Sequence, residues 1–185
     1  MSDQLSLWNE KPSRPATGNI LVGTASWTDQ SLIKSGRFYQ PEAKTPEQRL
    51  RYYASQFPVV EVDSTYYGLP SVDNSIRWVE RTPADFVFDV KAYRIFTLHQ
   101  TPLDSLPKEV REEVEGRENE KGNLYYPDLP GEVTDDLWTW FEDGIKPLRD
   151  AGKLGYVLLQ FPPWVMKRRS NLRHIEECAD RLYYC

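Results

Sequence analysis

The chain has 185 residues, which is enough for one ordinary domain and too few for two. Hydrophobic residues make up 39% and charged residues 28%, so the composition excludes a disordered or fibrous protein. No apolar run approaches the roughly 18 residues of a membrane-spanning helix, and the net charge of −5 argues against a broad nucleic-acid surface. The first nineteen residues lack the features of a secretory signal, and two cysteines are too few for a disulfide scaffold, so we expect a cytoplasmic protein.

Residues 1–18 are mostly polar and contain two prolines and a glycine. This pattern predicts a flexible lead-in, with Leu5, Leu7 and Trp8 as residues that could pack on the domain, before a domain at 19–185. From Ile20 onward, short runs rich in Val, Ile, Phe and Tyr predict strands. These runs are residues 20–25, 58–63, 85–92, 154–161 and 182–185.

Helical segments separate the predicted strands. Thr45 and Gln48 form a capping box with Pro46 at the first helical position, and a buried stripe of Leu50, Tyr53, Ala54 and Phe57 follows. A second helix is predicted from Ser71, burying Val72, Ile76 and Val79. A third is predicted from a Thr134 cap to Gly152, and a fourth from Ser170 or Asn171, burying Leu172, Ile175, Ala179 and Leu182 and leaving His174 exposed.

One long connection, residues 98–133, interrupts this alternation. It contains the sequence KEVREEVEGRENEK, which predicts a short, solvated helix. Elsewhere strands and helices alternate, which indicates parallel strands joined by right-handed crossovers. We count four β/α units and the start of a fifth strand.

The second and third strands have one apolar and one polar face. Val60 and Val62 alternate with Glu61 and Asp63, and a parallel sheet covered by helices on both faces would instead be apolar throughout. The pattern therefore favours a TIM-type (β/α) barrel with a partly polar interior.

Active sites of such barrels lie at the carboxyl ends of the strands. In this sequence those ends carry Ser26, Trp27, Asp63, Ser64, Lys91, Gln160 and Phe161, with Glu61 and Asp89 one layer deeper. Several carboxylates and a lysine in one cavity are costly unless they pair or bind a cation. They indicate either a metal or proton-transfer site, or an internal ion pair of Lys91 with Glu61 or Asp89.

Four stretches resemble the DUF72 or YecE-like family of unknown function. They are GTASW, FYQPEAKTPEQRLRYYASQFPVVEVDSTYYGLPS, RWVERTPADFVFDVKA and LLQFPPW, which together span most of residues 20–185. The resemblance implies a TIM-type barrel, of which this chain corresponds to an N-terminal portion. It also implies functional roles for Trp27, Glu61, Asp63, Ser64, Thr65, Tyr66, Lys91, Gln160 and Pro162.

Two positions depart from the family pattern. Asp63 stands where relatives often have asparagine, and the family's Thr-His pair is here Thr97-Leu98-His99. The first departure adds a negative charge to the cavity, and the second separates His99 from the position where the pattern places a histidine.

The leading hypothesis is an enzyme that performs metal-assisted hydrolysis or isomerisation of an anionic small molecule. Lys91 would hold the anion, while Glu61 and Asp63 would bind a divalent metal ion or act as bases. The expected substrate contacts are Trp27 and Tyr66 as a stacking wall, with Ser64, Thr65, Gln160 and His99.

Two alternatives stay open: a non-catalytic ligand-binding module, and a nuclease-like protein that uses the basic residues Lys167, Arg168, Arg169 and Arg173. An incomplete barrel would also expose sheet edges, so self-association is expected.

Overall fold

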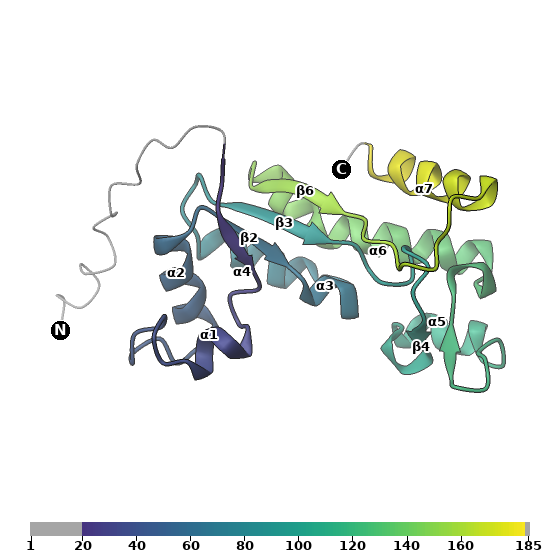
Figure 1. Ribbon diagram of the computed structural model, residues 1–185, viewed down its shortest axis with the longest axis horizontal. Helices are drawn as coiled ribbons and strands as arrows, with labels where there is room; N and C mark the ends of the chain where they lie inside the picture. The colour runs from purple at the N-terminus through teal and green to yellow at the C-terminus, as the bar shows by residue number, and fades with distance from the viewer. Residues whose placement is uncertain (1–19, 184–185) are drawn as a thin grey trace.

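The computed structural model describes residues 20–183, so the predicted lead-in with Leu5, Leu7 and Trp8 lies outside the described residues. Four parallel strands form one sheet in the order β1-β2-β3-β6 (Figure 1). Their bounds are β1 (Gly23–Ala25), β2 (Val59–Val62), β3 (Val87–Lys91) and β6 (Leu154–Leu158). The parallel α/β architecture is confirmed. Within residues 20–183 the sheet stays open, with β1 and β6 at its two edges.

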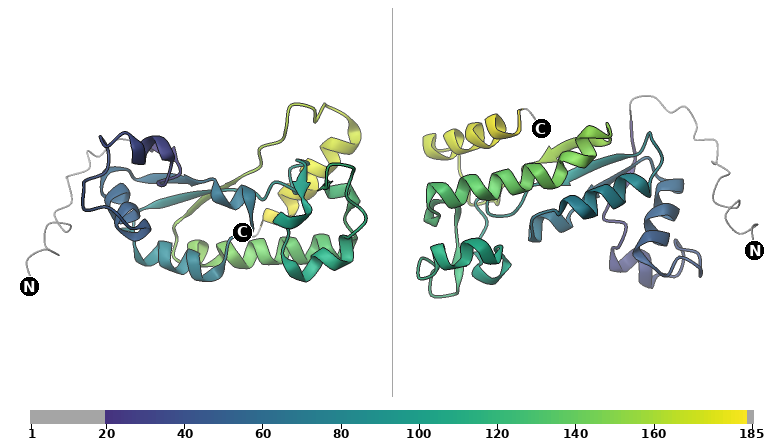
Figure 2. Two further views of the ribbon diagram at one scale, coloured as in Figure 1. Left: turned by 90° about the horizontal axis from the view of Figure 1, so that it is seen from below. Right: turned by 180° about the vertical axis from the view of Figure 1, so that it is seen from behind.

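The longer helices between the strands lie against one face of the sheet. Figure 2 places α4 and α6 on the same side of it, where they pack against each other. The helices are α1 (Gln30–Lys34), α2 (Pro46–Gln56), α3 (Ser64–Tyr67), α4 (Val72–Glu80), α5 (Lys108–Val114), α6 (Gly131–Asp150) and α7 (Arg169–Leu182).

The predicted cap of α2 is present in full. The Thr45 hydroxyl accepts from the Gln48 amide, and the Gln48 side chain accepts from the Thr45 amide. Ser71, where a helix was predicted to start, is the N-cap of α4, and its side chain accepts from the Asn74 amide. Both caps satisfy amides that the first turn of a helix leaves without partners.

The two faces of the sheet differ as the alternation predicts. Val60 and Phe88 are paired in register and fully buried beneath the helices. Glu61 and Asp89 are paired in the next register position, on the opposite face, and are only half-buried. The register of β2 with β3 therefore places the apolar side chains on the core face of the sheet and the polar side chains on the other face.

The beginning of α6 was predicted wrongly. The helix begins at Gly131, and Thr134 is a buried residue of its first turn, with its hydroxyl donating to the carbonyl oxygen of Pro130 at 3.1 Å. A threonine can bond to the carbonyl four residues earlier as readily as it caps a helix. Gly152 has the predicted positive φ of 66° just after the helix.

Two buried stripes also differ from the prediction. In α4, Val72 and Ile76 are exposed, and the small residue Ser75 is the buried residue of the helix instead. In α7, Leu172 is exposed and Cys178 is the buried residue.

The predicted fifth strand does not begin at Leu182, because Leu182 is the last residue of α7. Tyr183 is a turn residue, and Tyr184 and Cys185 lie outside the described residues. The first strand is also shorter than predicted: Ile20, Leu21 and Val22 precede β1 and are exposed.

The connection 98–133 has structure of its own. The predicted short helix is α5, and β4 (Thr101–Pro102) pairs antiparallel with β5 (Asn123–Leu124). Two 3₁₀ turns, η2 (Leu103–Ser105) and η3 (Tyr126–Asp128), complete it. Val110 and Val114 of α5 are buried, so the helix packs on the core and is not fully solvated.

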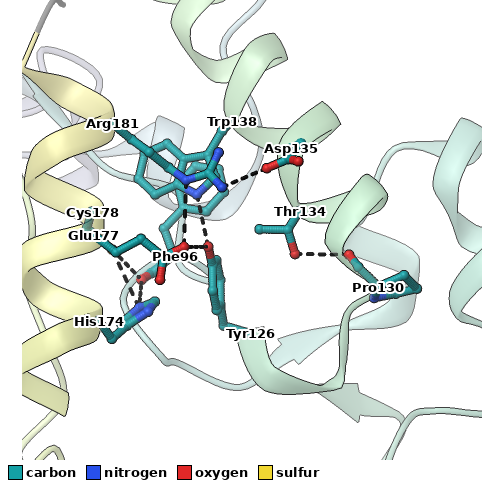
Figure 3. A network of polar contacts seen from close by, with 10 residues as sticks. All are labelled: Phe96, Tyr126, Pro130, Thr134, Asp135, Trp138, His174, Glu177, Cys178 and Arg181. Atoms are coloured by element: carbon teal, nitrogen blue, oxygen red, sulfur yellow. Dashed lines mark hydrogen bonds and ion pairs between the residues drawn. The ribbon is translucent and has the colours of Figure 1, made fainter. Parts of the chain in front are cut away.

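A polar network fixes α7 against α6 and η3 (Figure 3). Arg181 is paired with Asp135 at 2.6 Å, and the Tyr126 hydroxyl donates to Glu177 and accepts from the Trp138 indole, both at 3.3 Å. Burial raises the pKa of Tyr126 to about 12, so its hydroxyl stays protonated in this network.

The inner side of α7 completes this contact. The His174 ring nitrogen Nε2 lies 2.8 Å from the carbonyl oxygen of Phe96, so His174 is tied to the core and not exposed as predicted. Burial raises the pKa of the neighbouring Cys178 to about 12, which keeps this thiol neutral and unreactive.

The segment that leads into α4 approaches α6 closely at Gly144. A Cβ atom there would lie 2.2 Å from the carbonyl oxygen of Pro70. We expect Gly144→Ala to lower the free energy of unfolding by about 1–3 kcal/mol through overpacking, measured by urea denaturation.

Gly131→Ala is the matched control, since a Cβ atom at this position of the same helix meets nothing within 4 Å. Alanine favours a helix over glycine by about 1 kcal/mol, so the control is expected to be neutral or stabilising. Equal effects of the two substitutions would contradict the packing argument.

Candidate functional site

The carboxyl ends of β2, β3 and β6 bring side chains from distant parts of the sequence together. Tyr66 belongs to α3, directly after β2, while Lys91 ends β3 and Arg94 and His99 follow it. Parallel strands end at the same edge of a sheet, so these side chains meet there.

The ring of Tyr66 is the centre of this group. The Lys91 ammonium lies 5.0 Å and the Arg94 guanidinium 5.3 Å from the ring centroid, both over the ring. The His99 imidazole meets the same ring edge to face, with centroids 5.2 Å apart. Cations are attracted to the negative face of an aromatic ring, so Tyr66 gathers two positive charges that would otherwise repel.

No acidic side chain of residues 20–183 neutralises these two cations within 4 Å. The Nε atom of Arg94 is shielded from solvent and has no hydrogen-bond partner. Lys153 provides the contrast, because its buried ammonium donates to the carbonyls of Val79 and Thr82 and to the Thr82 hydroxyl. The group around Tyr66 thus has positive charge and donors free for an anion.

His99 is held by a strained turn. Leu98 has a φ of 62°, a left-handed conformation that is costly for a leucine, and the His99 amide donates to the Arg94 carbonyl at 3.1 Å. The Thr97 hydroxyl lies 2.9 Å from Nδ1 of His99 and 3.2 Å from the Arg94 carbonyl. When the hydroxyl donates to that carbonyl, Nδ1 carries the imidazole proton and Nε2 is left as an acceptor.

The charge state of His99 follows from its surroundings. Burial, together with the positive charges of Arg94 and Lys91, holds the pKa of His99 below its ordinary value. The imidazole is therefore neutral at neutral pH and can accept a proton.

A second layer lies deeper on the same face of the sheet. Glu61 is in register with Asp89, and burial, with a smaller effect of the Glu61 charge, raises the pKa of Asp89. A bulge between β3 and β6 brings Gly155 and Tyr156 to this side, where the Tyr156 hydroxyl and amide hydrogen-bond to the Asp89 carboxylate. A Cβ atom at Gly155 would lie 2.1 Å from Oδ1 of Asp89, so only glycine leaves room for this carboxylate.

The structure separates the predicted stacking wall. Trp27 is 9% exposed and packs edge to face on Trp78 and Phe88, with centroids 5.6 and 6.5 Å apart. It therefore belongs to the core beneath the sheet, on the opposite face from Lys91. Tyr66 alone of the predicted pair lies in the site.

Three predicted polar contacts have different positions. Thr65 is 1% exposed, and its hydroxyl is engaged by the carbonyls of Val62 and Lys91, so it ties β2 to β3 and has no surface for a ligand. Ser64 is exposed at the start of α3, and Gln160 is exposed just beyond β6.

The two predicted metal ligands, Glu61 and Asp63, have no third ligand grouped with them in the described part of the chain. No three His, Cys, Asp or Glu side chains of residues 20–183 are grouped to hold a metal ion. The alternation that aligned Asp63 with Glu61 ends at Val62, because Asp63 already has helical backbone angles (φ −83°, ψ −18°). These residues therefore do not fit a metal centre by themselves.

Two residues of the site were missed from the sequence. Arg94 lies three residues beyond Lys91, where the strand has already ended, and Trp164 belongs to the LLQFPPW stretch. The Trp164 ring lies 6.0 Å from that of His99. Trp164 could have been found from the sequence, because it lies just beyond the carboxyl end of the predicted strand 154–161.

The sequence matches the family described as "Protein of unknown function DUF72" over residues 21–184. The UPF0759 protein YunF of Bacillus subtilis (strain 168) is 28% identical over 163 residues, which cover 88% of this chain and 47% of that protein. The chain thus spans about half the length of this curated relative.

Two solved structures have a similar fold. A DUF72 family protein from Enterococcus faecalis V583 matches with a TM-score of 0.59 and 22% identity, covering 88% of this chain and 46% of that one. One from Thermotoga maritima MSB8 matches with a TM-score of 0.56 and 26% identity, covering 87% and 51%. Among residues 20–183, no helix combines the length and apolarity that crossing a membrane requires.

The lowered pKa of His99 can be measured by NMR titration. We expect a midpoint below the ordinary value of about 6.5, and inorganic phosphate should raise it by adding negative charge beside the imidazole. Because the folded pKa lies below the unfolded one, this group's contribution to stability is present above about pH 6.5 and is lost as pH falls through the folded value.

His99→Gln identifies the resonance and should remove this part of the pH dependence of stability. A midpoint at or above the ordinary value would contradict a pKa of His99 that is lowered by burial and by the charges of Arg94 and Lys91.

Proposed function

The chain belongs to the DUF72 family of proteins of unknown function, and we propose that it forms the anion-binding part of an enzyme acting on a small molecule. One observation carries this proposal: Lys91 and Arg94 converge on the ring of Tyr66 and have no carboxylate partner among residues 20–183. A phosphate or carboxylate group of the ligand would supply the missing negative charge.

We further propose that the four-stranded sheet is part of a TIM-type barrel. The order β1-β2-β3-β6 with parallel pairing is that of consecutive barrel strands, and the carboxylate face would be the interior. The chain covers about half of its longer relatives, which supports a barrel completed by further strands. Until they are paired, the edges β1 and β6 favour association with another chain.

The chemistry that fits this site is proton transfer. An anion held by Lys91 and Arg94 at the rim would place the adjoining atoms of the ligand toward Glu61 and Asp89. The raised pKa of Asp89 suits a carboxyl group that gives as well as takes a proton, and neutral His99 is a second acceptor.

Such groups suit an isomerisation, in which a base removes one proton from the ligand and the proton is returned at a neighbouring atom. They also suit hydrolysis, in which the base activates water. Asp63, half-buried at the start of α3, is the further acidic candidate.

Binding of inorganic phosphate, measured by isothermal titration calorimetry, tests the anion site. Each of Lys91→Gln and Arg94→Gln should weaken binding by about 10- to 100-fold, which corresponds to about 1.5–3 kcal/mol for a hydrogen bond to a charged group. Lys108→Gln, which removes the same charge from an exposed position at the start of α5, should leave binding unchanged.

Equal losses in all three variants would reveal non-specific attraction by charge. Failure of the parent protein to bind phosphate and other small anions would overturn the proposal.

A further inference from the structure

Trp164 is placed at the rim of the anion site in an unusual way. Its side chain is 58% exposed, and among the tryptophans of residues 20–183 it is the only strongly exposed one. Its ring meets the imidazole of His99 edge to face at 6.0 Å, and His99 in turn meets Tyr66. An indole this exposed is not part of the core of the described residues, and its ring contact connects it through His99 to the Tyr66 ring that carries Lys91 and Arg94.

The backbone presents this indole in a fixed turn. Pro162 is buried, and its carbonyl accepts from the Val165 amide at 3.0 Å, so that Pro163 and Trp164 are the central residues of a tight turn. Proline restricts the backbone at the first central position of such turns. A rigid turn reduces the entropy lost when a ligand packs on the indole.

We propose that Trp164 and His99 bind a planar aromatic ring of the ligand, so that the substrate class is a small molecule carrying both an anionic group and an aromatic ring, as a mononucleotide does. This inference rests on the proposed function, because the anionic group would be held by Lys91 and Arg94. Each part of such a ligand has a matching group in the site. Lys91 and Arg94 over Tyr66 would bind the anion. The exposed indole of Trp164, which meets the His99 ring as Tyr66 does, would bind the aromatic ring.

A ligand without an aromatic ring would make no stacking contact with Trp164. Stacking of a nucleobase on an aromatic side chain contributes about 1–3 kcal/mol, which corresponds to roughly 5- to 150-fold in affinity. The ring therefore changes affinity by an amount that calorimetry resolves easily.

The experiment compares three probes on the full chain: inorganic phosphate, ribose 5-phosphate and adenosine 5′-monophosphate. We expect the nucleotide to bind at least 5-fold more tightly than either of the others. In Trp164→Ala the nucleotide should fall to the affinity of ribose 5-phosphate, while the affinity for inorganic phosphate stays the same.

Met166→Ala is the matched control, because Met166 lies in the same segment and is equally exposed at 59%. It should leave all three affinities unchanged, and thermal melts of both variants should match the parent protein.

The outcomes separate the two proposals. Equal binding of all three probes, or an unchanged preference for the nucleotide in Trp164→Ala, overturns the aromatic-ring inference and leaves the anion site standing. If ribose 5-phosphate binds as tightly as the nucleotide, and both bind more tightly than inorganic phosphate, the site recognises the sugar. This result also overturns the aromatic-ring inference. Absence of binding by every probe overturns the anion site itself, and the inference with it.

Discussion

The alternation of side chains along β2 and β3 determines both the core and the site. Val60, Val62, Phe88 and Val90 lie fully buried under the helices, and the residues between them carry the carboxylates and Lys91 to the other face. A shift of the register by one residue would bury the charges and expose the core, at a large cost in free energy. The packing beneath the sheet thus fixes the pairing of Glu61 with Asp89 and the direction of Lys91.

Around this sheet, backbone strain is confined to the edge where the site lies. The described residues contain two non-glycine positions with positive φ, Ser26 after β1 and Leu98 in the connection that follows β3. Strained backbone of this kind persists only where surrounding contacts impose it, and it often accompanies functional sites. Here the contacts are the Ser26 amide to the Glu61 carbonyl and the turn that holds His99.

Polar groups are arranged differently in the candidate site around Tyr66 and in the contact of α7 with the core. Near the site, the positive charges of Lys91 and Arg94 have no carboxylate partner among the described residues, whereas the polar groups between α7 and the core are paired, as Arg181, Tyr126 and His174 show. Paired groups fix a helix in one position, while unpaired donors are available to a ligand. This difference is what separates a structural network from a candidate binding site in this molecule.

Much of this was determined by the sequence. Four of the five predicted strands, the cap at Thr45, the helix start at Ser71 and the polar face with Glu61, Asp89 and Lys91 follow from local periodicity and from spacing. The family followed from longer motifs, and its match over residues 21–184 confirms it. Such features depend on neighbours in the chain, which the sequence displays directly.

Only the tertiary structure decided which aromatic and basic side chains meet. Trp27 and Trp164 both follow strands, yet one is buried against Trp78 and the other stands beside His99. Arg94 reaches Tyr66 because two connections from different strands end at one edge. Periodicity ends where a strand ends, and beyond that point the direction of a side chain depends on turns and on partners distant in the sequence.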